Sequence, residues 1–202
     1  MTFPRCRLAL FPLVIVVLVG AGQPPARQKD PQSAYEPRSG PGAGQKFLAK
    51  FVGDWDVVKT FHPRSGEPSR QRGTCRQTME HDGRFLKSEF TFEQGDTKTT
   101  GTGLIGYETP NGPFSSVWID SRQTKMSARA GKGPFDGKEI VLYSKSFGDD
   151  AKGPTRSSRT VTKLEDDGNK IVHRQFAIAV DGSERLMMEL VMTRKSGGTS
   201  TK

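Results

Sequence analysis

Cysteine and histidine are scarce in this sequence. The 202 residues include two Cys and three His. Two thiols are too few for a disulfide framework or a four-cysteine zinc site, and the histidines, at positions 62, 81 and 173, lack the close spacing of metal ligands on one element. We therefore expect no metal site, no cofactor and no fold that depends on disulfide bonds.

Long apolar runs are also few. Hydrophobic residues make up 33% of the chain, which excludes a membrane protein with several spans, while 12 Phe argue against a wholly disordered chain. The one run, Leu8 to Val19, is about half as long as a spanning helix requires. It follows Arg5 and Arg7 and precedes small residues at 20–22, an order typical of a secretory signal peptide.

We therefore expect residues 1–22 to be a signal peptide and the protein to be exported, either to the periplasm or out of the cell. An uncleaved membrane anchor is the alternative. Cleavage near Ala21 or Gly22 would remove Cys6 and leave Cys75 as the only thiol. No Cys follows the small residues, so the acylation site of a lipoprotein is missing.

The net charge is +9, but it is not concentrated in one segment. Lys and Arg are spread along the chain with Asp and Glu between them, without the dense basic run typical of nucleic-acid-binding surfaces. We expect a solvated basic surface, no specific nucleic-acid partner and no transmembrane segment after signal cleavage. The oligomeric state stays open.

The mature chain divides by composition. Residues 23–44 are rich in Pro, Gly, Gln and Ser, which predicts a disordered linker. Residues 45–196 form the predicted folded domain, and residues 197–202 a disordered tail. The domain opens with Phe47, Leu48 and Phe51, spaced as on one amphipathic helical turn that Gly53 ends.

Beyond that turn, the sequence consists of short alternating or β-branched runs bounded by Gly, Pro, Asp or Asn. Asp-Gly and Asn-Gly pairs between the runs favour tight antiparallel hairpins. Such a set predicts an all-β, up-and-down barrel of about ten strands, because closure removes both sheet edges; a β-sandwich is the alternative. The predicted strands start near Asp54, Arg70, Arg84, Thr97, Phe114, Lys125, Lys138, Thr155, Asn169 and Ser183.

Gly53-Asp54-Trp55 resembles the G-x-W signature of the calycin barrels, which include lipocalins and fatty-acid-binding proteins. In such a barrel the Trp closes one end and a late Arg or Lys packs over it. The resemblance implies that Trp55 and Arg194 form the structural end of the barrel, with Lys195 as the alternative base.

A longer stretch, from about Gln45 to Lys195, contains Phe51-Val52-Gly53-Asp54-Trp55, Gly83-Arg84-Phe85-Leu86, Gly103 to Tyr107, Trp118-Ile119-Asp120, Asp181-Gly182 and Thr193-Arg194-Lys195. In these pieces the stretch resembles a bacterial family of unknown function, DUF1579. Glu108 departs from the Asp that the family usually has after Gly-Tyr. The resemblance implies a calycin-like fold and export and assigns no activity.

The sequence offers little catalytic machinery. It has no G-x-S-x-G elbow, and Cys75 would be a nucleophile only if His81 or His173 folded beside it; otherwise it is a buried, inert thiol. An inward polar cluster of Arg84, Trp118 and Asp120 is the enzyme hypothesis. The alternative for Asp120 is that it caps a turn beside Ser121 or pairs with Arg122, and that for Arg84 is that it flanks a turn.

Heme is a second chemical hypothesis, because the ten-stranded calycin-like nitrobindins bind heme through a strand histidine. Only His173 lies within a predicted strand. The face it shares with Ile171 and Gln175 is less apolar than the opposite face of Val172 and Phe176. We therefore predict that His173 points outward and that heme is not bound.

The last predicted strand carries the best indication of ligand binding. Leu186, Met188, Leu190 and Met192 alternate with other residues, so one face is entirely Leu and Met. Such a face suits a cavity for an apolar molecule and equally a packed core.

We therefore expect a binding protein for a small apolar or amphipathic ligand rather than an enzyme. An enzyme with a polar site in the barrel and a purely structural or partner-binding domain are the alternatives. The predicted ligand-contacting residues are Arg84, Trp118, Asp120, Met188 and Met192.

Overall fold

The computed structural model describes residues 31–35, 38–146 and 156–196. The predicted signal peptide (1–22), the predicted tail (197–202) and residues 23–30 and 36–37 of the predicted linker lie outside the described residues, so these boundaries stay predictions. The chain divides into residues 1–38 and 39–202. In the first unit the described part contains a single 3-10 turn, Pro31–Ala34. None of the helices in the described ranges has the length and hydropathy needed to cross a bilayer.

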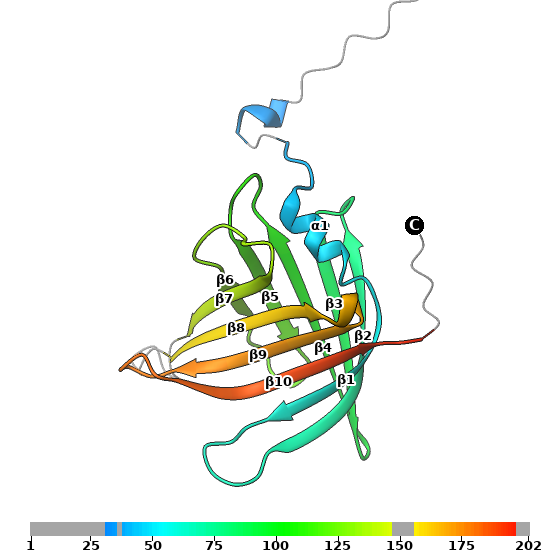
Figure 1. The fold of residues 1–202 in the computed structure, drawn as a ribbon, viewed down its shortest axis with the longest axis vertical. Helices are drawn as coiled ribbons and strands as arrows, with labels where there is room; N and C mark the ends of the chain where they lie inside the picture. Colours follow the sequence, from blue (N-terminus) through cyan, green and yellow to red (C-terminus); the bar gives the residue numbers. More distant parts are fainter. Residues whose placement is uncertain (1–30, 36–37, 147–155, 197–202) are drawn as a thin grey trace, which may run out of the picture. The chain divides into compact units, whose positions relative to one another are not determined.

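The second unit is a ten-stranded antiparallel barrel (Figure 1). Each strand pairs with its neighbours in the chain, and the last pairs with the first, so the sheet has no free edge. The all-β prediction is confirmed, and the sandwich alternative is wrong. The strands are β1 Gly53–Phe61, β2 Ser69–Glu80, β3 Phe85–Gln94, β4 Thr97–Tyr107, β5 Phe114–Asp120, β6 Ser127–Ala130, β7 Glu139–Ser146, β8 Arg156–Glu165, β9 Lys170–Ile178 and β10 Glu184–Arg194.

Turn chemistry accounts for the accuracy of the predicted strand starts. Between β2 and β3, His81, Asp82 and Gly83 have φ angles of 50°, 54° and 79°, the left-handed conformation that tight turns require. Asp166 and Asp167 adopt similar angles between β8 and β9. Short polar side chains and glycine tolerate this conformation at low cost. These residues therefore fix where one strand ends and the next begins.

The β6–β7 side of the barrel is the least paired. β6 has four residues, and its ladder with β7 consists of one residue pair, Ala130 with Tyr143. Arg129 occupies an inward position of β6, next to this gap.

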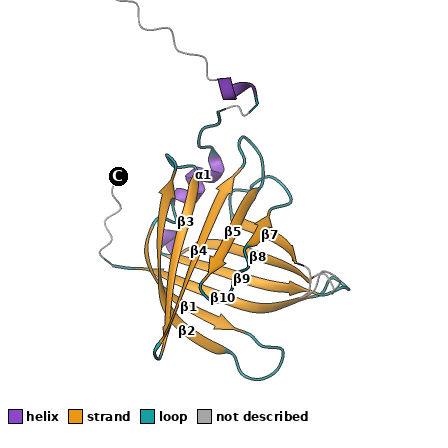
Figure 2. Ribbon diagram, turned by 180° about the vertical axis from the view of Figure 1, so that it is seen from behind, coloured by secondary structure: helices purple, strands orange, loops and turns teal. Residues whose placement is uncertain are grey.

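The helix α1, Ala43–Ala49, lies at one end of the barrel (Figures 1 and 2). It buries Leu48, and Phe51 just beyond it, against the strand ends. The helix ends at Ala49 rather than at Gly53, which instead begins β1. The predicted end was wrong because the turn at 50–52 follows the helix before the strand starts.

Trp55 is the centre of the closed end and is fully buried. Its indole Nε1 donates a hydrogen bond to the carbonyl oxygen of Phe51 at 3.0 Å. The guanidinium of Arg194 lies over the Trp55 ring, 4.2 Å from the ring centroid. Gly53 leaves room for that guanidinium, because a Cβ there would lie 2.5 Å from Arg194 Nη1.

Arg194 also joins three backbone segments. Its guanidinium donates hydrogen bonds to three carbonyl oxygens, at distances of 2.6 to 3.1 Å. In the β1–β10 ladder Arg194 stands opposite Trp55. From β10, one side chain therefore ties together the segment between α1 and β1 and the turn between β8 and β9. The accepting carbonyls belong to Lys50, Val52 and Gly168.

Replacing Arg194 with Leu removes the stacking on Trp55 and leaves three carbonyl oxygens without this donor. We expect the free energy of unfolding to fall by about 2–4 kcal/mol. Lys195→Leu is the matched control, because the side chain of Lys195 makes an exposed 3.5 Å ion pair with Asp56; its cost should be about 0.5 kcal/mol or less. Urea denaturation measures both, and equal losses would contradict the assigned role.

Candidate functional site

The barrel encloses a cavity of about 490 Å³. Side chains alternate along each strand, so every second residue faces this space. Leu48 and Phe51 lie at its α1 end. Arg122 and Gln123, which are exposed and follow β5, line it at the other end, where the cavity reaches solvent. The interior is therefore not filled by the barrel's own side chains.

Most of the cavity wall is apolar. Met188, Leu190 and Met192 of β10 face it, as the alternation predicted. A bulge between Leu186 and Met188 interrupts the pattern, so Met187 lines the cavity and Leu186 does not. Alternation in a sequence does not reveal such a bulge. The other apolar wall residues include Leu86, Phe90, Ile105, Ile140, Leu142 and Ile171.

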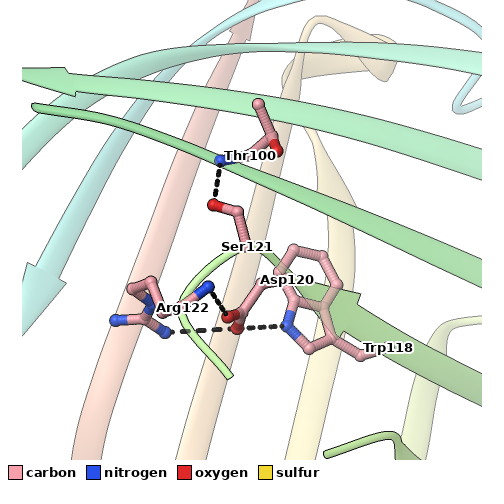
Figure 3. A network of polar contacts seen from close by, with 5 residues as sticks. All are labelled: Thr100, Trp118, Asp120, Ser121 and Arg122. Atoms are coloured by element: carbon pink, nitrogen blue, oxygen red, sulfur yellow. Dashed lines mark hydrogen bonds and ion pairs between the residues drawn. The ribbon is translucent and has the colours of Figure 1, made fainter. Parts of the chain in front are cut away.

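A polar cluster stands near the open end (Figure 3). The side chain of Asp120 is 3% exposed and accepts a hydrogen bond from Trp118 Nε1 at 3.0 Å. It also accepts bonds from the Arg122 backbone at 2.9 Å and the Arg122 side chain at 3.3 Å. Burial alone would raise the pKa of Asp120, but these hydrogen bonds outweigh it and hold that pKa below its usual range.

Glycines make room for this cluster. A Cβ at Gly101 would lie 2.4 Å from the Trp118 ring, and Gly103 is in contact range of the same ring. Two glycines on β4 thus let the indole of Trp118, which is on β5, pack against β4. Trp118 and Asp120 both line the cavity, so the structure brings this predicted pair together.

Arg84 is not part of the cavity lining in the described structure. Its guanidinium donates to the carbonyl oxygens of His81 and Ser39 and lies 3.5 Å from Asp82. The inward orientation considered for Arg84 is therefore wrong, because the residue precedes β3 and follows a turn. The three-residue enzyme site does not form.

Lys59 is the functional candidate that sequence reasoning missed. It lies on β1 with 6% of its surface exposed and lines the cavity. Its ammonium sits 3.6 Å from the centroid of the Phe92 ring. Burial lowers the pKa of Lys59 to about 8; the charge of Arg122 lowers it further and that of Asp120 opposes this. A Lys at an inward position of an alternating strand was the available signal.

His173 faces the cavity, contrary to the prediction. Its Nδ1 lies 2.8 Å from the Thr162 hydroxyl. Burial lowers the pKa of His173 to about 4, and the positive charge of Arg129 adds to that effect. The imidazole is therefore neutral at pH 7. The prediction failed because the more polar face of β9 points into the barrel. There the Thr162 hydroxyl is a hydrogen-bond partner for the imidazole of His173.

Comparisons with known proteins show which family this chain belongs to. The profile of a family described as "Protein of unknown function (DUF1579)" matches residues 40–194. The chain belongs to the DUF1579 family. No curated protein matches it.

Among solved structures, this DUF1579 barrel is similar to Rv2717c from M. tuberculosis, with a TM-score of 0.51 and 14% identity over 75% of this chain and 96% of that chain. An S-type phycobiliprotein lyase, CPES from Guillardia theta, matches with a TM-score of 0.49 and 9% identity over 76% of this chain and 93% of that one. At these identities Rv2717c supports the fold alone. The match to the lyase is too weak to add to that.

Cys75 of the DUF1579 barrel is a buried thiol, 2% exposed, in a core that includes Trp55 and Phe90. Burial raises the pKa of this thiol well above its usual range. Neither His81 nor His173 is hydrogen-bonded to it in the described structure. The alternative that Cys75 is a buried, inert thiol fits this environment. Nor do His, Cys, Asp and Glu side chains gather into a metal-binding group anywhere in the described ranges.

The low pKa of His173 gives a prediction about acid stability. The folded group binds its proton near pH 4 and the ordinary group near pH 6.5, so the unfolded chain takes up the proton first as pH falls. Stability from this group is therefore lost between pH 6.5 and 4. We expect the wild type to lose on the order of 2 kcal/mol more than His173→Gln across that interval in urea denaturation. Parallel losses in the two proteins would contradict the assignment.

Proposed function

We propose that this protein is a non-enzymatic binding protein that holds one small amphipathic molecule inside its barrel. The observation that carries the proposal is the cavity of about 490 Å³ that reaches solvent at one end. Its size falls within the range of small-molecule sites.

The lining has two regions, which suits a molecule with two ends. Apolar side chains such as Leu190, Met192 and Ile140 lie along the interior. Polar and charged side chains, among them Lys59 and Asp120, line the same space. Flexible Met side chains adapt to an apolar body, and the polar groups orient the rest of the ligand.

The alternatives find less support in the geometry. A purely structural domain would have a filled interior, and this one is hollow. The proposed enzyme cluster lacks Arg84, and Asp120 is already held by Trp118 and Arg122. A carboxylate with a lowered pKa that accepts several hydrogen bonds is poorly suited to remove a proton.

We also propose that the protein works outside the cytoplasm. The support is the N-terminal order of Arg5 and Arg7, the apolar run from Leu8 to Val19, and the small residues at 20–22.

Filling the cavity should weaken binding. Ser116 faces the cavity, whereas its neighbour Ser115 is exposed on the outer side of the same strand. We expect cis-parinaric acid, a fluorescent fatty acid, to bind the wild type saturably with micromolar affinity. Ser116→Phe should weaken this binding by about tenfold or more, and Ser115→Phe should leave it unchanged.

A titration without a saturable signal would contradict the proposal, and so would equal effects of the two variants. Circular dichroism shows whether both variants keep the β-sheet signal. Hemin serves as a second probe, because His173 faces the cavity. An absorbance change that is saturable in the wild type and lost in His173→Gln would favour heme as the ligand.

Export is tested by expressing the full sequence in a bacterial host and fractionating the cells. We expect the protein in the periplasm or medium, with an N-terminus near residue 22 by sequencing. Replacing Ile15 and Val17 with Arg interrupts the apolar run and should retain the protein in the cytoplasm. Wild-type protein found only in the cytoplasm with residues 1–22 intact would contradict export.

A further inference from the structure

We infer that the ligand of this cavity is an anion, with a carboxylate or similar acidic group that pairs with Lys59 and an apolar body that lies against β10. The inference rests on the proposed binding function and adds the chemical class of the ligand.

Lys59 is a buried cation that makes no ion pair within the described part of the chain. Its side chain is almost fully buried and faces the cavity. Among the described residues, no carboxylate lies within 4.0 Å of its ammonium group. Its close neighbours are aromatic: the Phe92 centroid is 3.6 Å away and that of Phe61 is 5.2 Å away. These rings give the ammonium a favourable electrostatic contact but supply no negative charge.

The charges of the cavity wall do not balance. Asp120 is the only acidic residue among the described residues that line the cavity. Its carboxylate is already occupied by Trp118 Nε1 and by Arg122. Lys59 and Arg129 remain, both basic and both in the wall.

Arg129 reinforces the imbalance. Its Nε is buried without a hydrogen-bond partner in the described structure. Burial lowers the pKa of Arg129, as expected of a cation taken from water without an ion pair. His173 is neutral at pH 7 and adds no charge of either sign.

A ligand with a negative charge would balance the unpaired positive charges of the cavity wall. Burial of an unpaired charge is costly, and a hydrogen-bonded counterion offsets much of that cost. An acid would therefore gain a charge-assisted hydrogen bond from Lys59 that a neutral ligand of the same shape lacks. The cavity thus discriminates between ligands by the charge of the polar end.

The position of Lys59 in the sheet indicates where the apolar part of the ligand would lie. In the β1–β10 ladder Lys59 stands opposite Leu190, and Val57 stands opposite Met192. Trp55 and the closed end of the barrel lie on the N-terminal side of Lys59 along β1. An acidic group at Lys59 therefore leaves the apolar part of the ligand beside Leu190 and Met192.

The test compares cis-parinaric acid with the alcohol of the same carbon chain at pH 7. We expect the wild type to bind the acid roughly ten to a hundred times more tightly than the alcohol. Lys59→Met keeps a flexible apolar stem and removes the charge, so it should lose most of this preference while retaining affinity for the alcohol. Lys98→Met is the matched control, because Lys98 is exposed on β4; it should keep the preference.

The outcomes separate the two proposals. Failure of both probes to bind the wild type would overturn the binding function itself. Equal binding of acid and alcohol would overturn only the anionic ligand. A preference that persists in Lys59→Met, or falls equally in Lys98→Met, would also overturn it, since the charge would then act from elsewhere. Alcohol binding by Lys59→Met shows that this variant is folded.

Discussion

The β1–β10 ladder closes the barrel, and the stacking of Arg194 on Trp55 reinforces its end. β1 and β10 are far apart in the chain, and their ladder is the one that turns an open sheet into a barrel. Arg194 stands at the end of that ladder, covers the Trp55 ring and binds carbonyl oxygens on either side. Without a closed sheet there would be no interior wall, so the cavity and its charges depend on this ladder.

Some residues of the interior pack one end of the barrel, and others are small enough to leave its middle hollow. Leu48, Phe51 and Trp55 pack the end under α1 as a core. Farther along, glycines such as Gly103 and short side chains such as Ser116 leave the middle hollow. Basic side chains then occupy part of the wall of that hollow. A barrel built only for stability gains nothing from burying an unpaired cation, and for this reason we propose a binding site here.

Much of the fold was predictable from local sequence. Asp-Gly and similar turns mark strand ends because few residues tolerate positive φ, and the ten strands begin within two residues of the predicted positions. The site was less predictable. Trp118 and Asp120 were found by their position on one face. Lys59 was missed because an inward Lys contradicts the usual pattern, and Arg84 was misplaced because its orientation is set by a turn.

The sequence by itself determined the strand order, because each tight turn is set by a few neighbouring residues. Its resemblance to known families indicated the end with Trp55 and Arg194 and the DUF1579 family. Only the tertiary structure decided which face of β9 points inward and how charges meet inside the barrel. The face of His173 depends on the register of strands on both sides and on Thr162 across the ladder. The charge imbalance of the cavity depends on residues from several strands that become neighbours only when the sheet closes.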